Sequence, residues 1–333
     1  MNDEHPVTEE VTCLVVGAGI AGLMAARELR RKGVEVIILD KSRGVGGRMA
    51  TRRFAGGVFD HGTQYFAPSS PWFQTRIAEW LDDGIAREWF RVRSFEMDPR
   101  FLSASRYCGS PVMTAIPKQL AGDIDVRTSE RASTLSRVED SWALTTDSGS
   151  RYIARSVILT APVPQSLALI DSIGIELSGE QREVLENIEY EPCLTMLGVC
   201  EGAPELPDGG VLEFERGNLR RIMDNAAKGV SPVPALTVHA MGDFSRKHFD
   251  DTEDEILASM KEETETVVGT SIREAQLHRW RYSQVVQPHH APMLVIDSDR
   301  PLIVAGDGFG VNGVEGAARS GMQAALAVMR QLV

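Results

Sequence analysis

The N-terminal part of the chain carries the pattern that most constrains its fold. A hydrophobic run at residues 11–16 meets a glycine-rich turn at 17–22, a helix-forming segment follows, and a second hydrophobic run at 34–39 ends on Asp40. Strand, glycine turn, helix, strand and acid, in this order, are typical of the βαβ unit that binds a dinucleotide. The pattern therefore predicts an α/β fold in which helices cover a parallel sheet.

The glycine turn has the spacing Gly-x-Gly-x-x-Gly, and each glycine has its own expected role. Gly17 permits the tight turn, Gly19 lets the backbone approach a pyrophosphate, and Gly22 lets helix and strand pack closely. Unpaired N–H groups at the start of the helix would face the phosphates. Asp40 stands at the distance along the chain where a carboxylate accepts hydrogen bonds from a ribose.

A second glycine cluster follows at once, with the sequence Lys-Ser-Arg-Gly-Val-Gly-Gly-Arg-Met over residues 41–49. A nicotinamide-binding fold needs no such cluster here, whereas flavoproteins of the amine oxidase and glutathione reductase class have one. In those proteins it folds over the pyrophosphate of FAD, and its guanidinium groups suit phosphate geometry. The cluster therefore indicates FAD, and the alternative is a basic surface turn.

Composition limits the classes of partner. A chain of 333 residues with a net charge of −12 is large enough for two lobes, and its acidity argues against a nucleic-acid or anionic-membrane surface. No hydrophobic stretch approaches the roughly 20 residues of a membrane span. The first residues are acidic and polar, unlike a secretory signal, and the four cysteines form no Cys-x-x-Cys pair. We therefore expect a cytoplasmic protein, a monomer or weak dimer, with Cys13 and Cys200 as core thiols.

The C-terminal part carries a second informative pattern. A hydrophobic run at 301–305 leads to Asp307, and a helix rich in small residues follows it. The carboxylate could accept hydrogen bonds from ribityl hydroxyls, and the helix N-terminus would point at the pyrimidine edge of a flavin. Gly316, Ala317 and Gly321 are expected to let the flavin lie against this helix. The alternative is a strand, turn and helix with a glycine cap.

Both chain ends thus belong to one cofactor domain, with a substrate domain inserted between them. We expect an FAD-binding Rossmann-type domain, similar to those of glutathione reductase and amine oxidases, over residues 1–68, 105–164 and 291–333. An α+β substrate domain would comprise residues 69–104 and 165–290. Hydrophobic periodicity predicts helices over 70–87, 112–120, 180–187, 252–268 and 315–332. It predicts strands over 124–126, 141–146, 152–154, 156–160, 194–200, 210–214, 235–241, 276–286 and 301–305.

With these motifs, the chain resembles the flavin-containing amine oxidase superfamily and, within it, the renalases and bacterial renalase-like proteins. The resemblance covers nearly the whole length. The segments that carry it are 59–66, 190–192, 238–240 with Ser245 and His248, 278–285 and 314–317. It implies cofactor contacts from Gly17, Gly19, Ile20, Ala21, Gly22, Asp40, Lys41, Arg43, Gly47, Arg48, Met49, Gln64, Val126, Asp307 and Val314.

The resemblance also implies a reaction. Renalase-type enzymes oxidise the 1,2- and 1,6-dihydro isomers of NAD(P)H by passing a hydride to flavin N5, and dioxygen reoxidises the flavin to give hydrogen peroxide and NAD(P)+. Such a transfer needs stacking and exclusion of water rather than a side-chain base. The sequence agrees, because it has no serine nucleophile elbow and no metal-ligand cluster. No cysteine lies near the C-terminal motif, so non-covalent FAD is expected.

Five residues are candidates for the catalytic site. The resemblance puts Gln64 and Tyr65 beside the flavin ring and Asn225 near a nicotinamide carboxamide, and it favours a pocket position for His239. Trp280 alternates with arginines along one strand, so it faces the side opposite to them. The alternative for His239 and Trp280 is plain core packing. For Gln64 it is a surface amide, and for Tyr65 a core aromatic.

Two other functions remain open at this stage. An amine oxidase would share the fold but would need an aromatic cage around a neutral amine, and only 6% of the residues are aromatic. A non-catalytic flavin-binding sensor would bind FAD that no cellular reductant bleaches quickly. A metal site at the adjacent histidines 289 and 290 is not expected, because no further ligands follow at metal spacing.

Overall fold

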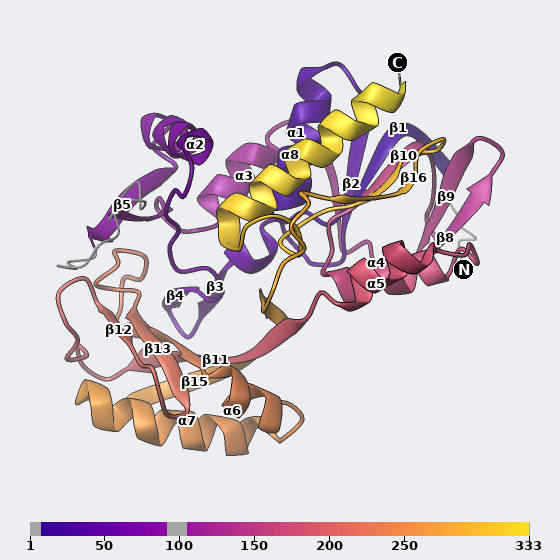
Figure 1. Cartoon of the computed structure of the whole chain (residues 1–333). Coiled ribbons are helices and arrows are strands. Elements are labelled where there is room, and N and C mark those ends of the chain that lie inside the picture. The colour runs from indigo at the N-terminus through magenta and orange to yellow at the C-terminus, as the bar shows by residue number, and fades with distance from the viewer. Residues whose placement is uncertain (1–7, 92–104, 333) are drawn as a thin grey trace, which may run out of the picture. The chain divides into compact units, whose positions relative to one another are not determined.

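The computed structural model describes residues 8–91 and 105–332 (Figure 1). The chain forms two compact units. Unit 1 comprises Met1–Gly47, Pro117–Glu189 and Val285–Val333, and unit 2 comprises Arg48–Ile116 and Tyr190–Gln284. These boundaries differ from the expected domains, since residues 48–68 and 105–116 fall in unit 2, and 165–189 and 285–290 in unit 1. Packing rather than sequence continuity decides this division.

Unit 1 contains an eight-stranded sheet with the strand order β16-β17-β10-β1-β2-β7, and the β8–β9 hairpin is attached to β10. Its strands are β1 (Thr8–Val16), β2 (Val36–Asp40), β7 (Asp125–Thr128), β8 (Ala132–Val138), β9 (Ser141–Thr146), β10 (Arg151–Leu159), β16 (Leu294–Asp297) and β17 (Leu302–Val304). Strands β17, β10, β1, β2 and β7 are parallel to their neighbours in this order. This architecture confirms the predicted α/β class.

The register of the parallel strands brings the two terminal motifs together. Val16 pairs with Leu39 on one side and with Leu159 on the other, and Leu159 pairs with Val304. The four strands therefore end at the same level of the sheet. Ligands of open α/β sheets bind at this carboxyl edge. The glycine turn, Asp40 and the segment after β17 all begin there.

Two long helices pack against each other in unit 1, α1 (Ile20–Arg31) and α8 (Gly313–Leu332) (Figure 1). A Cβ atom at Gly321 would lie 1.9 Å from the carbonyl oxygen of Ala21, and one at Gly316 would lie 1.5 Å from that of Val311. These two glycines are thus required by backbone packing. Backbone packing thus gives both glycines a structural reason that does not depend on the expected contact with a flavin. The shorter helices are α3 (Ala115–Ala121), α4 (Val163–Asp171) and α5 (Gly179–Glu186).

Unit 2 contains a five-stranded sheet with the order β12-β13-β14-β11-β15. Its strands are β11 (Tyr190–Cys200), β12 (Val211–Glu213), β13 (Leu219–Asp224), β14 (Ala235–Ala240) and β15 (Ile272–Val285). Helix α7 (Glu253–Val268) lies along this sheet (Figure 1) and buries Ile256 and Met260 in a core with Leu194 and Val238. Thr252 and Glu255 form a capping box at its start, which confirms the predicted helix. Helix α6 (Gly242–Lys247) precedes it.

A small hairpin packs on the same sheet through a separate core. Strands β3 (Thr51–Phe54) and β4 (Gly57–Asp60) are antiparallel, and Phe59 clusters with Leu197, Val199 and Ala235. Phe59 is completely buried. Its packing fixes the chain that follows, residues 60–64, relative to strands β11 and β14. The remaining elements of unit 2 are the short helix η1 (Gly47–Met49), which begins at the unit boundary, α2 (Pro71–Asp82), β5 (Ala86–Arg91) and β6 (Ser105–Gly109).

The predicted helix over 70–87 is too long. Helix α2 ends at Asp82, and Gly84 then adopts a φ of +70°, which a helix cannot accommodate. The chain continues as β5, which pairs with β6. The apolar residues of the helix are followed closely by those of the strand, so their spacing in the sequence did not show where the helix ends. Conversely, the two strands expected over 152–160 form the single strand β10.

Candidate functional site

The glycine turn of unit 1 has two glycines fixed by packing and one that faces open space. Gly17 has a φ of +109°, and a Cβ atom at Gly22 would lie 1.9 Å from the carbonyl oxygen of Gly17. A Cβ atom at Gly19 would meet nothing within 4 Å. Within the described part of the chain no side chain caps helix α1, and its first internal hydrogen bond runs from Leu23 N–H to Gly19 O. The preceding N–H groups, including those of Ile20 and Ala21, are thus left to an external acceptor.

Asp40 ties the end of β2 to this turn. Its Oδ2 accepts a hydrogen bond of 2.6 Å from Ala18 N–H, and its Oδ1 accepts one of 2.7 Å from Ser42 N–H. An ionised carboxylate can accept about four hydrogen bonds, so two positions remain. The side chain is half-buried at the carboxyl edge of the sheet. Asp40 therefore both shapes the loop and retains acceptor capacity for a ribose.

The second glycine cluster folds back onto the first turn. Gly46 N–H donates a 2.8 Å hydrogen bond to Ala18 O, and a Cβ atom at Gly47 would lie 3.5 Å from the Cα of Gly19. Two stretches of bare backbone therefore lie against each other beside the open space at Gly19. This arrangement fits the pyrophosphate of a dinucleotide. Among the expected charged contacts, Arg43 is exposed, and Lys41 Nζ donates to Gln165 Oε1 at 3.2 Å.

Arg48 and Met49 were expected to contact the cofactor but fall in unit 2. The Arg48 guanidinium donates to Ser283 O at 3.2 Å, and the Arg48 carbonyl accepts a 2.7 Å hydrogen bond from Thr63 N–H. Met49 is buried. Arg48 therefore has structural contacts with β15 and with the turn after β4, which sequence reasoning did not indicate.

The C-terminal motif reaches the same edge of unit 1 as the glycine turn. Ala305 N–H donates to Leu159 O at 2.9 Å, and Asp307 follows immediately. Ser320 of α8 fixes this loop, because its Oγ accepts from Gly306 N–H at 2.8 Å and donates to Pro292 O at 2.6 Å. Val314 lies in the first turn of α8. Ser320 was not singled out in the sequence, where a serine within a small-residue helix gives no signal.

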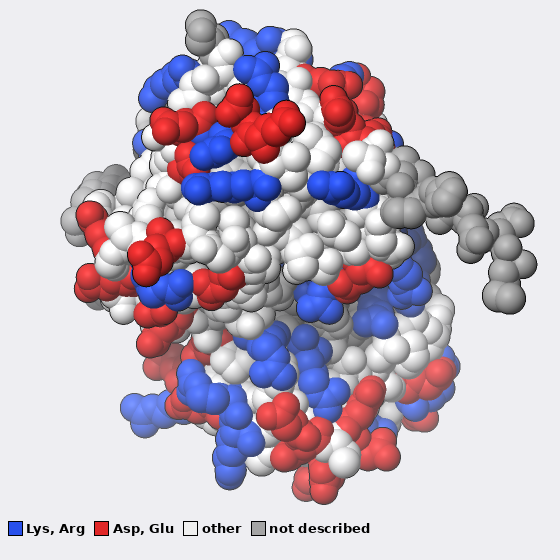
Figure 2. Space-filling model, turned by 90° about the vertical axis from the view of Figure 1, so that its right-hand side faces the viewer, with Lys and Arg blue, Asp and Glu red and all other residues white. Residues whose placement is uncertain are grey.

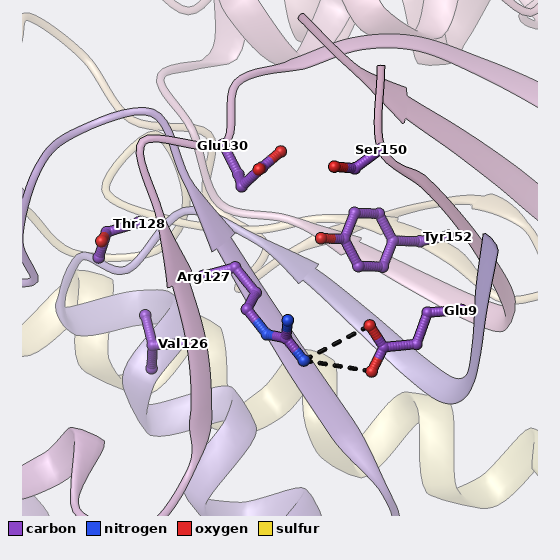
Figure 3. A pocket seen from close by; sticks show the side chains of 7 residues that line it. All are labelled: Glu9, Val126, Arg127, Thr128, Glu130, Ser150 and Tyr152. Atoms are coloured by element: carbon purple, nitrogen blue, oxygen red, sulfur yellow. Dashed lines mark hydrogen bonds and ion pairs between the residues drawn. The ribbon is translucent and has the colours of Figure 1, made fainter. Parts of the chain in front are cut away.

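A polar cavity of about 330 Å³ lies beside β7 (Figure 3). Its lining residues are Glu9, Val126, Arg127, Thr128, Glu130, Ser150 and Tyr152. The Arg127 guanidinium is paired with Glu9 at 3.2 Å and with Asp125 at 2.6 Å. Val126 is one of the expected cofactor contacts, and Thr128 pairs with Asp40 in the sheet. The expected catalytic residues do not belong to this lining.

Those five residues are all found in unit 2, around the turn that follows β4. His239 Nε2 and Trp280 Nε1 each lie 3.2 Å from the carbonyl oxygen of His61. Asp60 N–H donates to Asn225 Oδ1 at 3.2 Å, and Gln64 and Tyr65 end the turn. Side chains from β14, β15 and the segment after β13 thus hold the main-chain groups of one five-residue stretch. The structure brings the predicted residues together through this backbone.

Asn225 has a different environment from the one expected. It is completely buried, and its Nδ2 donates to Thr237 Oγ1 at 2.9 Å and to Ala235 O at 3.3 Å. With Oδ1 bonded to Asp60 N–H, both amide atoms have partners within the protein. Thr237 Oγ1 in turn donates to Asp60 O at 3.0 Å. Asn225 therefore holds the turn and has no free amide atom for the carboxamide of a ligand.

Gln64 and Tyr65 point in different directions. Gln64 is 2% exposed, and its Nε2 donates back to Asp60 O, while its Oε1 has no partner among the described residues. The Tyr65 hydroxyl donates to Glu213 Oε1 at 2.9 Å. The guanidinium groups of Arg106 and Arg221 lie 5.8 and 5.6 Å from the centre of the Tyr65 ring. Burial raises the pKa of Tyr65, so its hydroxyl stays protonated.

Two histidines and one tryptophan form a compact ring cluster at the turn, and His239 joins it through its hydrogen bond with His61 O. The His61 ring centroid lies 4.9 Å from that of His278 and 5.1 Å from that of Trp280, and His278 and Trp280 are 4.3 Å apart. Burial lowers the pKa of His61 to about 4, that of His239 to about 3 and that of His278 to about 4. All three imidazoles are therefore neutral above about pH 5.

Lys228 was not predicted from the sequence. Its Nζ lies 2.9 Å from Asp60 Oδ2, and the side chains of this ion pair are both completely inaccessible to solvent. The ammonium also donates to Gln64 O at 2.6 Å and lies 4.6 Å from the centre of the Trp89 ring. Asp60 Oδ1 accepts from Thr51 Oγ1 and Met113 N–H. Lysine is rarely buried, so its position in the sequence gave no signal.

Comparison with known proteins decides the family. The profile of an NAD(P)-binding Rossmann-like domain matches residues 15–83, and that of flavin containing amine oxidoreductases matches residues 92–329. The chain belongs to the flavin containing amine oxidoreductase family. Its members are flavin-dependent oxidoreductases, so membership implies a flavin cofactor, which the paired glycine loops fit.

The proteins similar to this chain differ in how much of it they cover. Renalase of Mus musculus is 27% identical over 96% of this chain and 98% of its own length, which confirms the predicted resemblance. Lysine-specific histone demethylase 1 homolog 3 of Oryza sativa is 46% identical, but over only 15% of the chain and 6% of its own length. Wild-type putrescine oxidase bound to putrescine shares the fold, with a TM-score of 0.70, 16% identity and coverage of 97% of this chain and 100% of that chain.

The surface, the helices and the possible metal ligands add three further observations. On the face drawn in Figure 2, acidic and basic side chains are interspersed over short distances. Within residues 8–91 and 105–332, no helix combines the length and the apolar character that a membrane crossing requires. In the same part of the chain, no three side chains of His, Cys, Asp or Glu come together as a possible metal site.

Proposed function

We propose that this flavin-dependent oxidoreductase oxidises the 1,2- and 1,6-dihydro isomers of NAD(P)H. The observation that carries the proposal is the similarity to renalase over nearly the full length of both chains. It includes unit 2, where the expected substrate-side residues His239 and Trp280 meet at one backbone carbonyl. The partners would be the dinucleotide substrate and dioxygen.

Bound FAD would supply a hydride acceptor at N5 and an electron donor to dioxygen, so that one dihydronicotinamide isomer, one proton and one dioxygen give one NAD(P)+ and one hydrogen peroxide. The chain's own contribution is a surface for the nicotinamide ring. The Trp280 indole and the imidazoles of His61, His239 and His278 provide an aromatic, uncharged surface. Hydride transfer requires no side-chain base, so aromatic rings without charge of their own are sufficient for this role.

An amine oxidase remains the second candidate, because putrescine oxidase has the same fold. At 16% identity this similarity supports the fold alone. A non-catalytic flavin-binding protein is the third candidate. The three differ in what reduces the flavin, so a single experiment separates them.

Anaerobic mixing of the purified flavoprotein with the 1,2- or 1,6-dihydro isomer is expected to bleach the flavin rapidly. Ordinary NADH carries its hydride at a different ring carbon, so a pocket set for the isomers misaligns it. A misplacement of about 1 Å costs roughly a hundredfold in rate, and we expect NADH and simple amines to be slower by at least that factor. Stopped-flow absorbance measures the rates. Rapid bleaching by an amine alone would establish an amine oxidase, and no bleaching by any reductant would favour the binding protein.

We also propose that the flavin is FAD and that no covalent bond holds it. The segment 306–321 contains neither cysteine nor histidine, the usual residues for covalent attachment. Burial raises the pKa of Cys13 to about 12 and that of Cys200 to about 11, so neither thiol is a ready nucleophile. Acid or heat denaturation should release all the flavin into the supernatant, where chromatography identifies it as FAD. Flavin that remains with the precipitated polypeptide would contradict this proposal.

A further inference from the structure

The direction of the hydrogen bond at His239 is fixed by its partner. His239 Nε2 lies 3.2 Å from His61 O, and a carbonyl oxygen can only accept. Nε2 therefore carries the proton. Because burial keeps this imidazole neutral, Nδ1 has no proton and is a hydrogen-bond acceptor.

The same reasoning gives His278 the opposite polarity. Its Nδ1 lies 3.3 Å from Nη1 of Arg52, and a guanidinium can only donate. Nδ1 is therefore the acceptor in this pair, and the proton of the neutral ring resides on Nε2. His278 thus has a donor at Nε2, where His239 has an acceptor at Nδ1.

Both of these ring nitrogens are available to a ligand. Neither His239 Nδ1 nor His278 Nε2 has a hydrogen-bond partner among residues 8–91 and 105–332, and both side chains are half-buried rather than enclosed. Trp280 links them, because its ring packs 4.3 Å from that of His278 and its Nε1 donates to the same His61 oxygen as His239. One donor, one acceptor and an aromatic face therefore belong to the same cluster.

We infer that His239 and His278 recognise a primary carboxamide carried on a flat ring. His239 Nδ1 accepts a hydrogen bond from the amide NH2, His278 Nε2–H donates one to the amide oxygen, and Trp280 contacts the ring. This inference rests on the proposed function and names the group that determines its specificity. Asn225, whose amide is fully occupied, holds the turn instead. A carboxylate offers no proton to His239, and a protonated amine offers no acceptor to His278.

Two variants remove one ligand contact each and retain the internal hydrogen bond. In His239→Gln, the new amide NH2 replaces Nε2 against His61 O, and the Nδ1 acceptor is lost. In His278→Asn, the new amide oxygen replaces Nδ1 against Arg52, and the Nε2 donor is lost. His290→Gln, at an exposed histidine of unit 1, is the matched control. Circular dichroism and flavin occupancy verify that each holoenzyme is intact.

The probes are NAD+ and its 3-acetylpyridine analogue, which keeps the carbonyl oxygen but lacks the NH2 group. Their dissociation constants are measured by perturbation of the flavin absorbance. We expect the wild type and His290→Gln to bind NAD+ about tenfold more tightly than the analogue. In His239→Gln this difference should disappear, whereas His278→Asn should weaken both ligands about tenfold and keep their ratio.

A His239→Gln protein that still prefers the carboxamide would overturn the inference. If that variant loses its flavin, the wild type is the test. A wild-type protein that binds NAD+ and the analogue with equal affinity would also contradict the inference. The proposed function is tested separately, by flavin reduction. If the isomers bleach the flavin but NAD+ and its analogue bind equally well, only the inference is wrong. If NAD+ binds more tightly but the isomers do not bleach the flavin, the proposed reaction is wrong and the carboxamide site is supported.

Discussion

Gly19→Val is expected to give a folded protein that purifies without its flavin. A Cβ atom at this position meets nothing within 4 Å, so the protein itself tolerates the side chain. The branched side chain would instead fill the space beside the glycine loops and prevent the pyrophosphate from approaching the N-terminus of α1. Loss of two hydrogen bonds to a charged group weakens binding by about a hundredfold or more. The ratio of flavin to protein absorbance measures the occupancy, and circular dichroism measures the fold.

Gly179→Val is the matched control for this experiment. Gly179 is an exposed first residue of α5, and a Cβ atom there also meets nothing within 4 Å. The control should retain wild-type occupancy. Asp40→Ala is a poorer test, because it also removes the acceptor for Ala18 and Ser42 N–H and so disturbs the loop itself. Wild-type flavin occupancy in Gly19→Val would contradict the assignment of this turn to the cofactor.

Lys228→Met is expected to destabilise the protein by about 3–5 kcal/mol. The methionine has a similar volume but leaves Asp60 buried and without its counter-ion, and it leaves the carbonyl of Gln64 without a donor. The cost arises mainly from the uncompensated carboxylate, since no water can reach it. Urea unfolding followed by circular dichroism gives the change in the free energy of unfolding.

The double variant Asp60→Asn with Lys228→Met identifies the source of this cost. Asparagine keeps an oxygen for Thr51 and Met113 but carries no charge, so it should recover much of the lost stability. Lys261→Met is the control, because the pair of Lys261 with Glu265 is partly exposed to solvent and spans 3.7 Å. We expect it to change stability by less than about 1 kcal/mol. Equal effects of the two lysine substitutions would show that the buried pair has no special role.

Elements with strong local signals were predicted well from the sequence. The order of elements at residues 11–40 predicted a βαβ unit, and two of its glycines meet local demands: Gly17 has a φ of +109°, and a Cβ atom at Gly22 would lie 1.9 Å from the carbonyl oxygen of Gly17. The acidic first turn and the capping box of α7 are likewise local, and the predicted helix agrees with the observed one. Strand β9 over Ser141–Thr146 matches its predicted range. The glycine motifs that indicated the flavin family are likewise short, so they can be recognised from neighbouring residues alone.

Local patterns failed where a boundary depended on partners elsewhere. The helix over 70–87 was too long because only pairing with β6 converts residues 86–91 to a strand. The division into units likewise depends on packing across the chain, since Phe59 is buried by residues of β11 and β14. The sequence also did not show that Gly316 and Gly321 lie against the backbone carbonyls of Val311 and Ala21.

The candidate site itself was decided by tertiary structure. The sequence and its resemblance selected His239, Trp280 and Gln64, but not the hydrogen bonds that unite them with the turn after β4. The hydrogen bond between Lys228 and Gln64 joins residues 164 positions apart, and the one between Trp280 and His61 joins residues 219 positions apart. A sequence determines which side chains can donate, accept or carry charge, and it specifies local turns and caps through neighbouring residues. Which proton resides on which imidazole nitrogen, and whether Asn225 or Lys228 is free or fully bonded, depends on partners that only folding brings within 3 Å or so.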